Sequence, residues 1–444
     1  MADRVATRVK YASPMHQSPL TMRSRYLLVA TFLLQLTCSA IAHGAENERW
    51  NAAWAAVPDS AGPALKPGTI RQVVRTTIAG SKIRMRLSNL YGSTAVTIGA
   101  THLAMHADGA RIRAGTDHRL TFAGRPTVTI PTGSSVLSDP VEMALPALAD
   151  LAVSIYLPNG AAASSVHGTG MQTAFIASGD VGAALDLGSA QQDDSRYFLT
   201  DVEVVPNQPA HTLVVLGDSV ADGVGAANDR NARWTDFLAA RLQANPALAS
   251  LAVINAGIAG NRLLSDAVAP FVGPSALSRF QRDALDKHGV RWIVLHEGIN
   301  DIATATLTRR PQDQVTAAQI IEGMRTLAAR ARAQRIKIGV GTLLPFEGTK
   351  GFYSAAAEAE RQKVNAWIRT SGAFDAVLDF DLVLRDPDHP DRLRPDFDSG
   401  DHLHPNEEGY KLMAKTVDLR MLGNEIAEIS QPEDSQQRKA SMGR

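Results

Sequence analysis

Four short segments of the chain contain the residue types that a serine hydrolase needs. They are Gly217-Asp218-Ser219, the stretch NAGIAGN at 255–261, EGIND at 297–301 and GDHLHPN at 400–406. A serine hydroxyl is scarcely ionised at neutral pH, so a serine nucleophile requires a neighbouring base. Ser219 is therefore a candidate nucleophile only if another segment supplies that base.

The fourth segment contains a suitable base. His404 has an imidazole whose ordinary pKa suits it to take up and return a proton. Asp401, three residues earlier, can hold that imidazole in the required tautomer and stabilise its charged form. The backbone N–H groups of Ser219 and Gly260 and the side-chain amide of Asn300 are candidate donors to the oxyanion of a tetrahedral intermediate. In combination these residues predict acyl transfer.

Each of these residues also has a purely structural interpretation when it is taken singly. Ser, Asp and Asn commonly cap helices, Gly forms turns, and a lone His is often a surface or capping residue. His402 and His296 are rival bases, disfavoured because neither follows an aspartate at the spacing of Asp401 and His404. Asp218 and Asp301 are expected to support the loops rather than to form the carboxylate pair of a glycosidase.

The segments after residue 206 must be positioned by an α/β domain, predicted at 206–425. Strand-like runs are found at 211–216, 251–255, 292–296, 336–342 and 376–380, and helical runs near 233–243, 275–288, 316–334, 354–370 and after Pro405. This alternation predicts a three-layer α/β/α architecture with a parallel sheet. Because ligands bind beyond the carboxyl ends of such strands, the four segments are expected to converge at one edge.

Residues 46–205 show a different pattern. Stretches such as KIRMRLSNLYG and LAVSIYLPNG alternate apolar and polar residues and end in Gly, Pro or Asn. Many short strands with regular turns predict an all-β accessory domain, a sandwich or jelly roll. Every candidate catalytic residue lies after Pro209, so a fragment that begins near Asn207 is expected to keep activity on a small ester if the α/β domain folds alone. An apolar interface shared with the β domain would instead cause the fragment to aggregate.

Residues 1–45 are interpreted as a signal peptide and leader. An apolar run at 26–36 follows two arginines, and a small-x-small cleavage pattern ends at Ala42. The run is shorter than the roughly 20 residues that span a bilayer. Cleavage after Ala42 and a secreted or periplasmic protein are therefore predicted, without a stable membrane anchor, whether translation starts at Met1 or at Met22. Cys38, the single cysteine, lies in this segment, and residues 426–444 form a polar tail.

Charge and motif content limit the partners. The chain has 45 Lys and Arg and 45 Asp and Glu, so no net field attracts nucleic acid or an anionic membrane. No Cys or His cluster has metal-ligand spacing and no Gly-rich phosphate loop is present, so no metal and no organic cofactor are expected. A small neutral or weakly charged ester substrate fits this balance, and the oligomeric state stays open.

The four segments together resemble the sequence blocks of the SGNH/GDSL hydrolase superfamily. The matching blocks are Gly-Asp-Ser with Ser219, the glycine block with Gly260, Gly298-x-Asn300-Asp301 and Asp401-x-x-His404. The resemblance covers residues 211–422 and implies a flavodoxin-like sheet. It also implies that Ser219, Gly260, Asn300 and His404 are the four namesake residues and that Asp401 completes a catalytic triad.

The stretches NAGIAGNRLL, EGINDI and SGDHLHPNEEGY further resemble a secreted subgroup of arylesterases and acetylxylan esterases (XynE-like), which is similar in its N-terminal β region too. His296 departs from that pattern, because an apolar residue is expected before Glu297. The resemblance implies a secreted esterase that hydrolyses short acyl esters, acetyl first, on polysaccharide through an acyl-enzyme on Ser219. A lipase or lysophospholipase, and a carbohydrate-binding protein with a vestigial hydrolase domain, are the alternatives.

Overall fold

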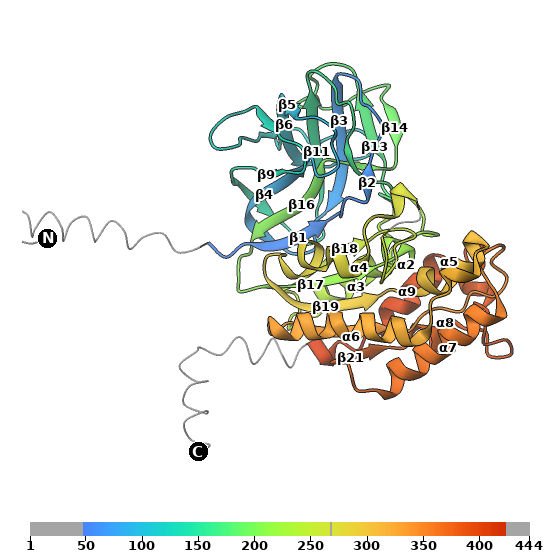
Figure 1. The fold of residues 1–444 in the computed structure, drawn as a ribbon. Helices are drawn as coiled ribbons and strands as arrows, with labels where there is room; N and C mark the ends of the chain where they lie inside the picture. The colour runs from blue at the N-terminus through green and yellow to red at the C-terminus, as the bar shows by residue number, and fades with distance from the viewer. Residues whose placement is uncertain (1–47, 267–268, 423–444) are drawn as a thin grey trace, which may run out of the picture. The chain divides into compact units, whose positions relative to one another are not determined.

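The computed structural model describes residues 48–266 and 269–422. The predicted signal peptide, with Met22, Cys38 and the cleavage site at Ala42, and the predicted polar tail lie outside the described residues. From Arg49 onward the described residues form one compact unit, in which an all-β region (the β region, 49–205) precedes an α/β region (206–422; Figure 1). No helix in these ranges combines the length and apolarity that crossing a membrane requires.

The β region is built from antiparallel strand pairs. Its first sheet contains, in spatial order, β1 (Asn51–Ala55), β16 (Leu199–Val205), β4 (Gly80–Ser88) and β10 (Val141–Leu145), with β9 (Ser135–Leu137) paired to β4. The second contains β14 (Gln191–Asp193), β13 (Ala174–Ala177), β3 (Gly68–Arg75), β11 (Asp150–Leu157), β6 (Ala100–Met105) and β7 (His118–Arg119). Smaller sheets join β15 (Arg196–Tyr197), β12 (Ser165–His167) and β2 (Ser60–Ala61), and β5 (Val96–Ile98) with β8 (Val128–Ile130).

The two large sheets of the β region share one apolar core. Alternate residues of β4, such as Ile83 and Met85, pack in it with alternate residues of β11, such as Val153 and Ile155. A strand places successive side chains on opposite faces, so this period of two buries one face of each sheet. Two sheets around a common core are the arrangement of a β-sandwich. The jelly-roll form of the prediction stays a prediction.

The α/β region contains a five-stranded sheet that is parallel throughout, as predicted. Its spatial order is β18 (Leu251–Gly257), β17 (His211–Gly217), β19 (Val290–His296), β20 (Lys337–Gly341) and β21 (Ala376–Leu378). β17 is the first of these strands along the chain, but in the sheet it lies between the second, β18, and the third, β19. The direction of winding reverses beside β17, and ligands bind at such a switch point in parallel sheets.

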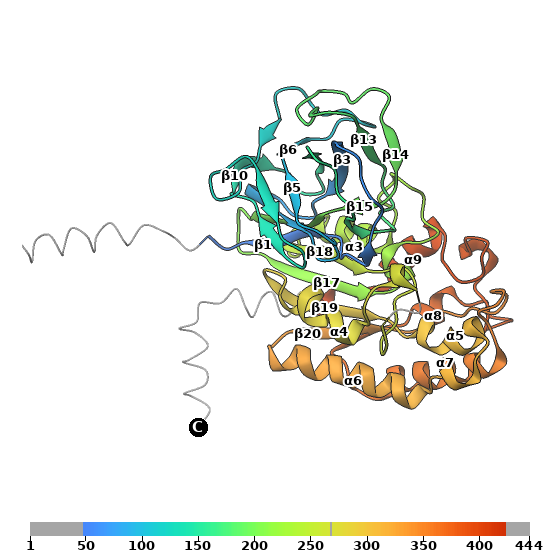
Figure 2. The same cartoon turned by 45° about the horizontal axis from the view of Figure 1, so that its top comes forward.

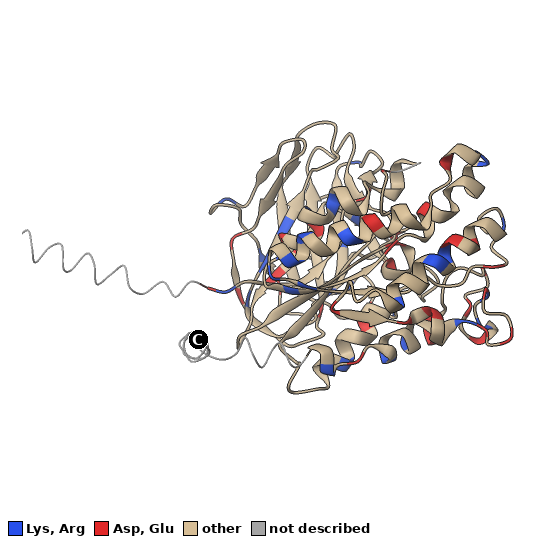
Figure 3. Ribbon diagram, turned by 60° about the horizontal axis from the view of Figure 1, so that its bottom comes forward, with Lys and Arg blue, Asp and Glu red and all other residues tan. Residues whose placement is uncertain are grey.

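Helices cover both faces of this sheet (Figures 1 and 2). They are α2 (Ser219–Asp222), α3 (Trp234–Gln243), α4 (Ala276–Phe280, continued by a π-helical turn at Gln281–Leu285), α5 (Ile299–Thr308), α6 (Ala317–Ala333), α7 (Ala355–Thr370), α8 (Phe380–Leu384) and α9 (Glu407–Thr416). Short 3₁₀ turns occupy Pro270–Val272, Pro311–Asp313 and Pro395–Phe397. Basic and acidic residues are interspersed along the helices in the view of Figure 3.

The side chains of the central strand β17 are buried by helices on both faces of the sheet. Val214 and Leu216 pack against apolar residues of α4, α5, α6 and α7, whereas Leu213 and Val215 pack against those of α3, α8 and α9. Each of these four side chains is fully buried. A continuous apolar strand buried on both faces is typical of a parallel sheet between helix layers. The sequence prediction of three layers therefore has a direct physical basis in β17.

The strand β1 belongs to the β region but packs on the α/β region as well. Ala52 and Ala55 of β1 lie in the same apolar core as Val214 and Ile254. The Ala52 N–H donates to the His288 carbonyl at 3.0 Å. In Figures 1 and 2 this strand lies alongside β18.

This packing concerns the condition that the α/β region must fold alone for a fragment from Asn207 to keep its activity. Removing the β region would expose the apolar residues that Ala52, Ala55 and Val57 cover, and exposed patches of that kind promote aggregation. The division into an accessory domain at 46–205 and a hydrolase domain at 206–425 stays a prediction. The contacts of β1 show that the two regions are packed together.

Candidate active site

The serine of the first segment lies at a tight turn after β17. Asp218 caps α2, its Oδ1 accepting a hydrogen bond from the Val220 N–H at 3.0 Å. Ser219 is the first residue of α2 and is 7% exposed. Gly217 is needed because a Cβ at that position would lie 2.8 Å from the His296 carbonyl oxygen of the neighbouring strand. The capping and the nucleophile interpretations of the segment are compatible, because Asp218 caps the helix and the turn presents Ser219.

Ser219, His404 and Asp401 form a continuous hydrogen-bonded line. The His404 Nε2 lies 2.8 Å from the Ser219 Oγ, and the His404 Nδ1 lies 2.5 Å from the Asp401 Oδ2. Since Nδ1 faces a carboxylate, that nitrogen carries the proton, and Nε2 is then free to accept the serine proton. The structure brings together the three side chains in the order that a nucleophile, a base and an orienting carboxylate require.

Asp401 is held in its ionised form. Partial burial raises its pKa, but hydrogen bonds from the His404 side chain and from the backbone N–H groups of His404 and Leu403 outweigh burial. The net result is a pKa below the ordinary range of an aspartate. A carboxylate that stays charged at neutral pH can stabilise the imidazolium that forms when His404 takes up a proton.

The rival base His402 also has an aspartate partner, at a spacing of four residues where His404 has three. Its Nδ1 lies 2.6 Å from the Asp398 Oδ2, four residues earlier. The His402 side chain is 55% exposed and its backbone has a φ of 65°, and no contact with Ser219 is present in the described structure. Both histidines have a carboxylate partner, but only the His404 ring lies within hydrogen-bonding distance of the Ser219 Oγ.

His296, the other rival, is enclosed in the protein core. Its Nε2 lies 3.1 Å from the Thr342 carbonyl oxygen and its ring packs edge-on against Phe380. Burial lowers the pKa of His296, although nearby Asp218 opposes that effect. The other ring nitrogen, Nδ1, is buried without a hydrogen-bond partner in the described structure.

The backbone N–H groups of Ser219 and Gly260 form no hydrogen bond within the described part of the chain. Gly260 lies in the segment 258–261, named here the glycine loop, and has a φ of 77°. A glycine adopts that conformation readily, and a Cβ there would lie 2.6 Å from Val272 Cγ1. These unbonded donors fit the oxyanion role that the sequence assigns to them.

The amide of Asn300, the third predicted donor, lies against the glycine loop. Its Nδ2 donates to the Asn261 carbonyl at 2.8 Å. A side-chain amide has two N–H groups, so one remains for a substrate while the other fixes the orientation of the side chain. Asn300 is the second residue of α5, whose N-terminus follows β19 at the same edge of the sheet as Ser219.

Asp301, predicted to support the loops, secures the chain that leaves the glycine loop. Its two carboxylate oxygens accept hydrogen bonds from the Leu263 N–H at 2.6 Å and the Leu264 N–H at 3.0 Å. Burial raises the pKa of Asp301 to about 6 in spite of these bonds. Burial likewise raises the pKa of the enclosed Asp218, which His296 and His404 partly oppose.

The sequence did not point to Arg279, a buried residue of α4 that connects several of these segments. Its guanidinium donates to the Gly217 carbonyl at 2.9 Å, the Ala256 carbonyl at 2.7 Å and the Asn261 Oδ1 at 2.9 Å, and it lies 3.3 Å from Glu297 Oε1. It therefore ties the ends of β17 and β18 to the glycine loop. A charged residue on the apolar face of a helix was the available signal, because buried charges are rare unless they are paired.

No group of three or more His, Cys, Asp or Glu side chains in the ranges 48–266 and 269–422 is arranged to hold a metal ion. The chemistry that the described residues can perform is nucleophilic attack by Ser219 with proton transfer through His404. An ester or thioester carbonyl is the kind of group on which such a site acts.

Part of the α/β region is similar to a known protein family. Residues 215–412 match the model of the GDSL-like lipase/acylhydrolase family. No curated protein matches the chain. The GDSL part of the sequence resemblance is thus confirmed, and the XynE-like subgroup stays a prediction.

Several solved structures resemble the chain over about half of its length. A catalytic mutant of an acetylxylan esterase from Geobacillus stearothermophilus is 20% identical, with 48% of this chain and 94% of that chain covered and a TM-score of 0.36. An aryl esterase from M. smegmatis is 16% identical, with coverages of 49% and 99% and a TM-score of 0.37. A lipase/acylhydrolase from Enterococcus faecalis is 20% identical, with coverages of 48% and 96% and a TM-score of 0.36. These likenesses leave the substrate of this chain open.

Proposed function

We propose that the GDSL-like lipase/acylhydrolase domain of this chain is a working serine esterase that cleaves short acyl esters through an acyl-enzyme on Ser219. The observation that carries the proposal is the contact of 2.8 Å between Ser219 Oγ and His404 Nε2, with Asp401 at 2.5 Å on the other side of the imidazole. The unbonded N–H groups of Ser219 and Gly260 support it. A vestigial domain would have no reason to retain all of these elements.

The proposed reaction has two symmetrical halves. Ser219 Oγ attacks the ester carbonyl carbon while its proton passes to His404 Nε2, and the charge on the carbonyl oxygen is received by the N–H groups of Ser219 and Gly260 and by Asn300. His404 then returns the proton to the departing alcohol, which leaves an acyl group on Ser219. A water molecule repeats the sequence and releases the acid, while Asp401 stabilises the imidazolium in both halves.

A short acyl group is favoured by the distribution of apolar surface. The large apolar side chains that are exposed in the described residues are Leu185, Phe271, Leu307, Val377 and Leu382. They come from a loop of the β region, a 3₁₀ turn, α5, β21 and α8, with one from each. A helix that docks on lipid instead carries a continuous apolar face of its own. The first choice is therefore an acetyl ester, with acetylated polysaccharide as the natural carrier.

Secretion belongs to the same proposal. It is supported by the apolar run at 26–36 and by the small-x-small pattern that ends at Ala42 in the sequence. An exported, net-neutral esterase would meet extracellular carbohydrate rather than nucleic acid.

The deciding experiment measures rates on a graded panel. p-Nitrophenyl acetate, butyrate and octanoate, acetylated xylan and lysophosphatidylcholine are compared on one preparation, with the Ser219→Ala variant as the blank. The proposal expects the highest kcat/KM on acetate and release of acetate from the polymer. Preference for octanoate or the lysolipid would instead support the lipase alternative, and binding of xylan without any hydrolysis would support a vestigial domain.

Asn300→Ala is expected to lower kcat by about 10²–10³-fold with little change in KM. The amide is proposed to receive charge that develops only in the transition state, so its loss affects turnover rather than ground-state binding. Steady-state kinetics on p-nitrophenyl acetate check this, with Asn207→Ala, an exposed asparagine between β16 and β17, as the matched control. A raised KM with unchanged kcat would make Asn300 a ground-state contact.

A further inference from the structure

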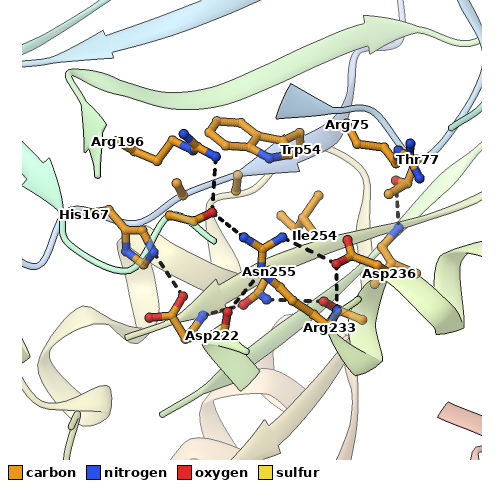
Figure 4. A pocket seen from close by; sticks show the side chains of 16 residues that line it. Trp54, Arg75, Thr77, His167, Arg196, Asp222, Arg233, Asp236, Ile254 and Asn255 are labelled. Carbon is orange, nitrogen blue, oxygen red and sulfur yellow. Dashed lines mark hydrogen bonds and ion pairs between the residues drawn. The ribbon is translucent and has the colours of Figure 1, made fainter. Parts of the chain in front are cut away.

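A small polar cavity of about 40 Å³ lies where the β region meets the nucleophile turn. Its wall includes His167 and Arg196 from the β region and Asp222 and Arg233 from the α/β region (Figure 4). Asp222 ends the same α2 turn that begins with Ser219. The cavity is therefore lined on one side by the element that presents the nucleophile.

His167 spans the two regions as a charged imidazolium. Its Nδ1 lies 3.0 Å from the Val57 carbonyl oxygen, and its Nε2 lies 3.0 Å from both the Thr169 carbonyl oxygen and Asp222 Oδ1. Both ring nitrogens thus face only acceptors, so each must carry a proton. Burial lowers the pKa of His167, but Asp222 and Asp59 outweigh burial and raise it to about 9.

Asp222 connects His167 to the glycine loop. Its Oδ1 faces His167, and its Oδ2 accepts a hydrogen bond from the Ala259 N–H at 2.9 Å. Ala259 precedes Gly260, whose own N–H forms no hydrogen bond within the described part of the chain. One carboxylate therefore joins a histidine of the β region, the nucleophile turn and the proposed oxyanion site.

We propose that His167 is a positioning residue for the esterase site, holding the Gly260 N–H in place through Asp222. The β region would then contribute directly to turnover. This inference rests on the proposed function, since a positioned oxyanion donor matters only if Ser219 forms an acyl-enzyme. A displacement of about 1 Å in such a donor can cost about 10²-fold in rate.

Other charged groups lie close to His167. Asp59, in the loop after β1, has an oxygen 3.8 Å from Nδ1. Arg233 donates to the backbone carbonyls of Asp222 and Gly170, and Arg196 also donates to the Gly170 carbonyl. Burial lowers the pKa of Arg196, so Arg196 is a second group that an alkaline titration would affect.

The pH dependence has a definite sign. Because the folded pKa of His167 is raised, the stabilising contact is complete at neutral pH and is lost as the pH rises through about 9. The neutral ring must then present an unprotonated nitrogen to Asp222 or to the Val57 carbonyl. The rate per active serine is expected to fall over that pH range in the wild-type protein.

The test compares two substitutions in the full-length chain. His167→Gln keeps a donor at the position of Nε2 but removes the titrating proton, whereas His167→Leu removes both donors. His102→Gln is the matched control, because His102 pairs with Asp117 at 2.9 Å elsewhere in the β region. Rates on p-nitrophenyl acetate between pH 7 and 10, thermal unfolding, and titration of the active serine with a fluorophosphonate are measured for each.

The expected result is a kcat lower by about 10²-fold in His167→Leu, calculated per titrated serine, with KM nearly unchanged. The kcat of His167→Gln should lie between those of the wild type and His167→Leu, and it should not fall near pH 9. Arg196 is still present in His167→Gln, so a fall caused by Arg196 would persist in that variant. His102→Gln should match the wild type in both respects.

Two outcomes overturn the inference. One is a wild-type kcat per titrated serine in His167→Leu, which would leave His167 with a role in folding alone. The other is an alkaline fall that persists unchanged in His167→Gln, with kcat at pH 7 equal to that of the wild type. A wild-type protein that shows no Ser219-dependent hydrolysis is a different result, because it removes the proposed function itself.

Discussion

Ser219→Ala should lower ester hydrolysis by about 10⁵-fold or more, because removing the nucleophile of a triad costs nearly as much as removing the whole triad. The residual rate should still exceed that in water, since the N–H groups of Ser219 and Gly260 remain to bind a developing oxyanion. The measurement is the initial rate on p-nitrophenyl acetate together with covalent labelling by a fluorophosphonate. Labelling of the wild type and not of the variant would assign the acyl group to this hydroxyl.

The same variant should remain folded. The Ser219 Oγ contacts His404 and no other hydrogen-bonding side chain in the described structure, so its loss should change the free energy of unfolding by only about 1 kcal/mol. Ser135→Ala, at an exposed serine of β9, is the control for a neutral loss of a hydroxyl. Turnover of Ser219→Ala close to that of the wild type would exclude Ser219 as the nucleophile.

His404→Gln should reduce kcat about as severely as Ser219→Ala, by about 10⁵-fold, because nucleophile and base act as one unit. His402→Gln should leave kcat near the wild-type value. The pair is closely matched, since each histidine has an aspartate within hydrogen-bonding distance of Nδ1, at 2.5 Å for His404 and 2.6 Å for His402. Only the Nε2 of His404 reaches the Ser219 Oγ.

Steady-state rates and circular dichroism on both histidine variants complete this comparison. A large loss at His402 with little effect at His404 would mean that the loop 400–406 rearranges when substrate binds. The base would then have to be reassigned to the Asp398–His402 pair.

The parallel sheet was predictable because its strands are continuous apolar runs separated by turn residues. The run at 211–216 needed no tertiary information, since burial on both faces leaves a signature in the sequence itself. The convergence of four distant loops followed from the rule that strand-to-helix loops emerge on one edge. The helix α5 (Ile299–Thr308) was not predicted, because its first turn was interpreted as the loop motif EGIND and its three threonines offset the helical preference of its two alanines.

The residues that the sequence missed act through contacts between distant segments. Arg279 ties β17 and β18 to the glycine loop, and His167 reaches Asp222 from another region of the chain. No local period or motif records such pairs, because each contact joins residues that are far apart in the sequence. The contact between His402 and Asp398 was missed for the same reason, since it depends on a backbone turn and not on spacing alone.

The double role of β1 has a consequence for how the chain acquires its fold. β1 is among the first described residues to leave the ribosome, yet its sheet partner β16 is the last strand of the β region, and the core that Ala52 and Ala55 enter is made later still. Joining segments so far apart costs chain entropy before burial offsets it, which slows folding. The packing of β1 therefore cannot be completed until the α/β region has been synthesised. We therefore expect the two regions to assemble late and together, and the incompletely folded chain to remain accessible to chaperones until then.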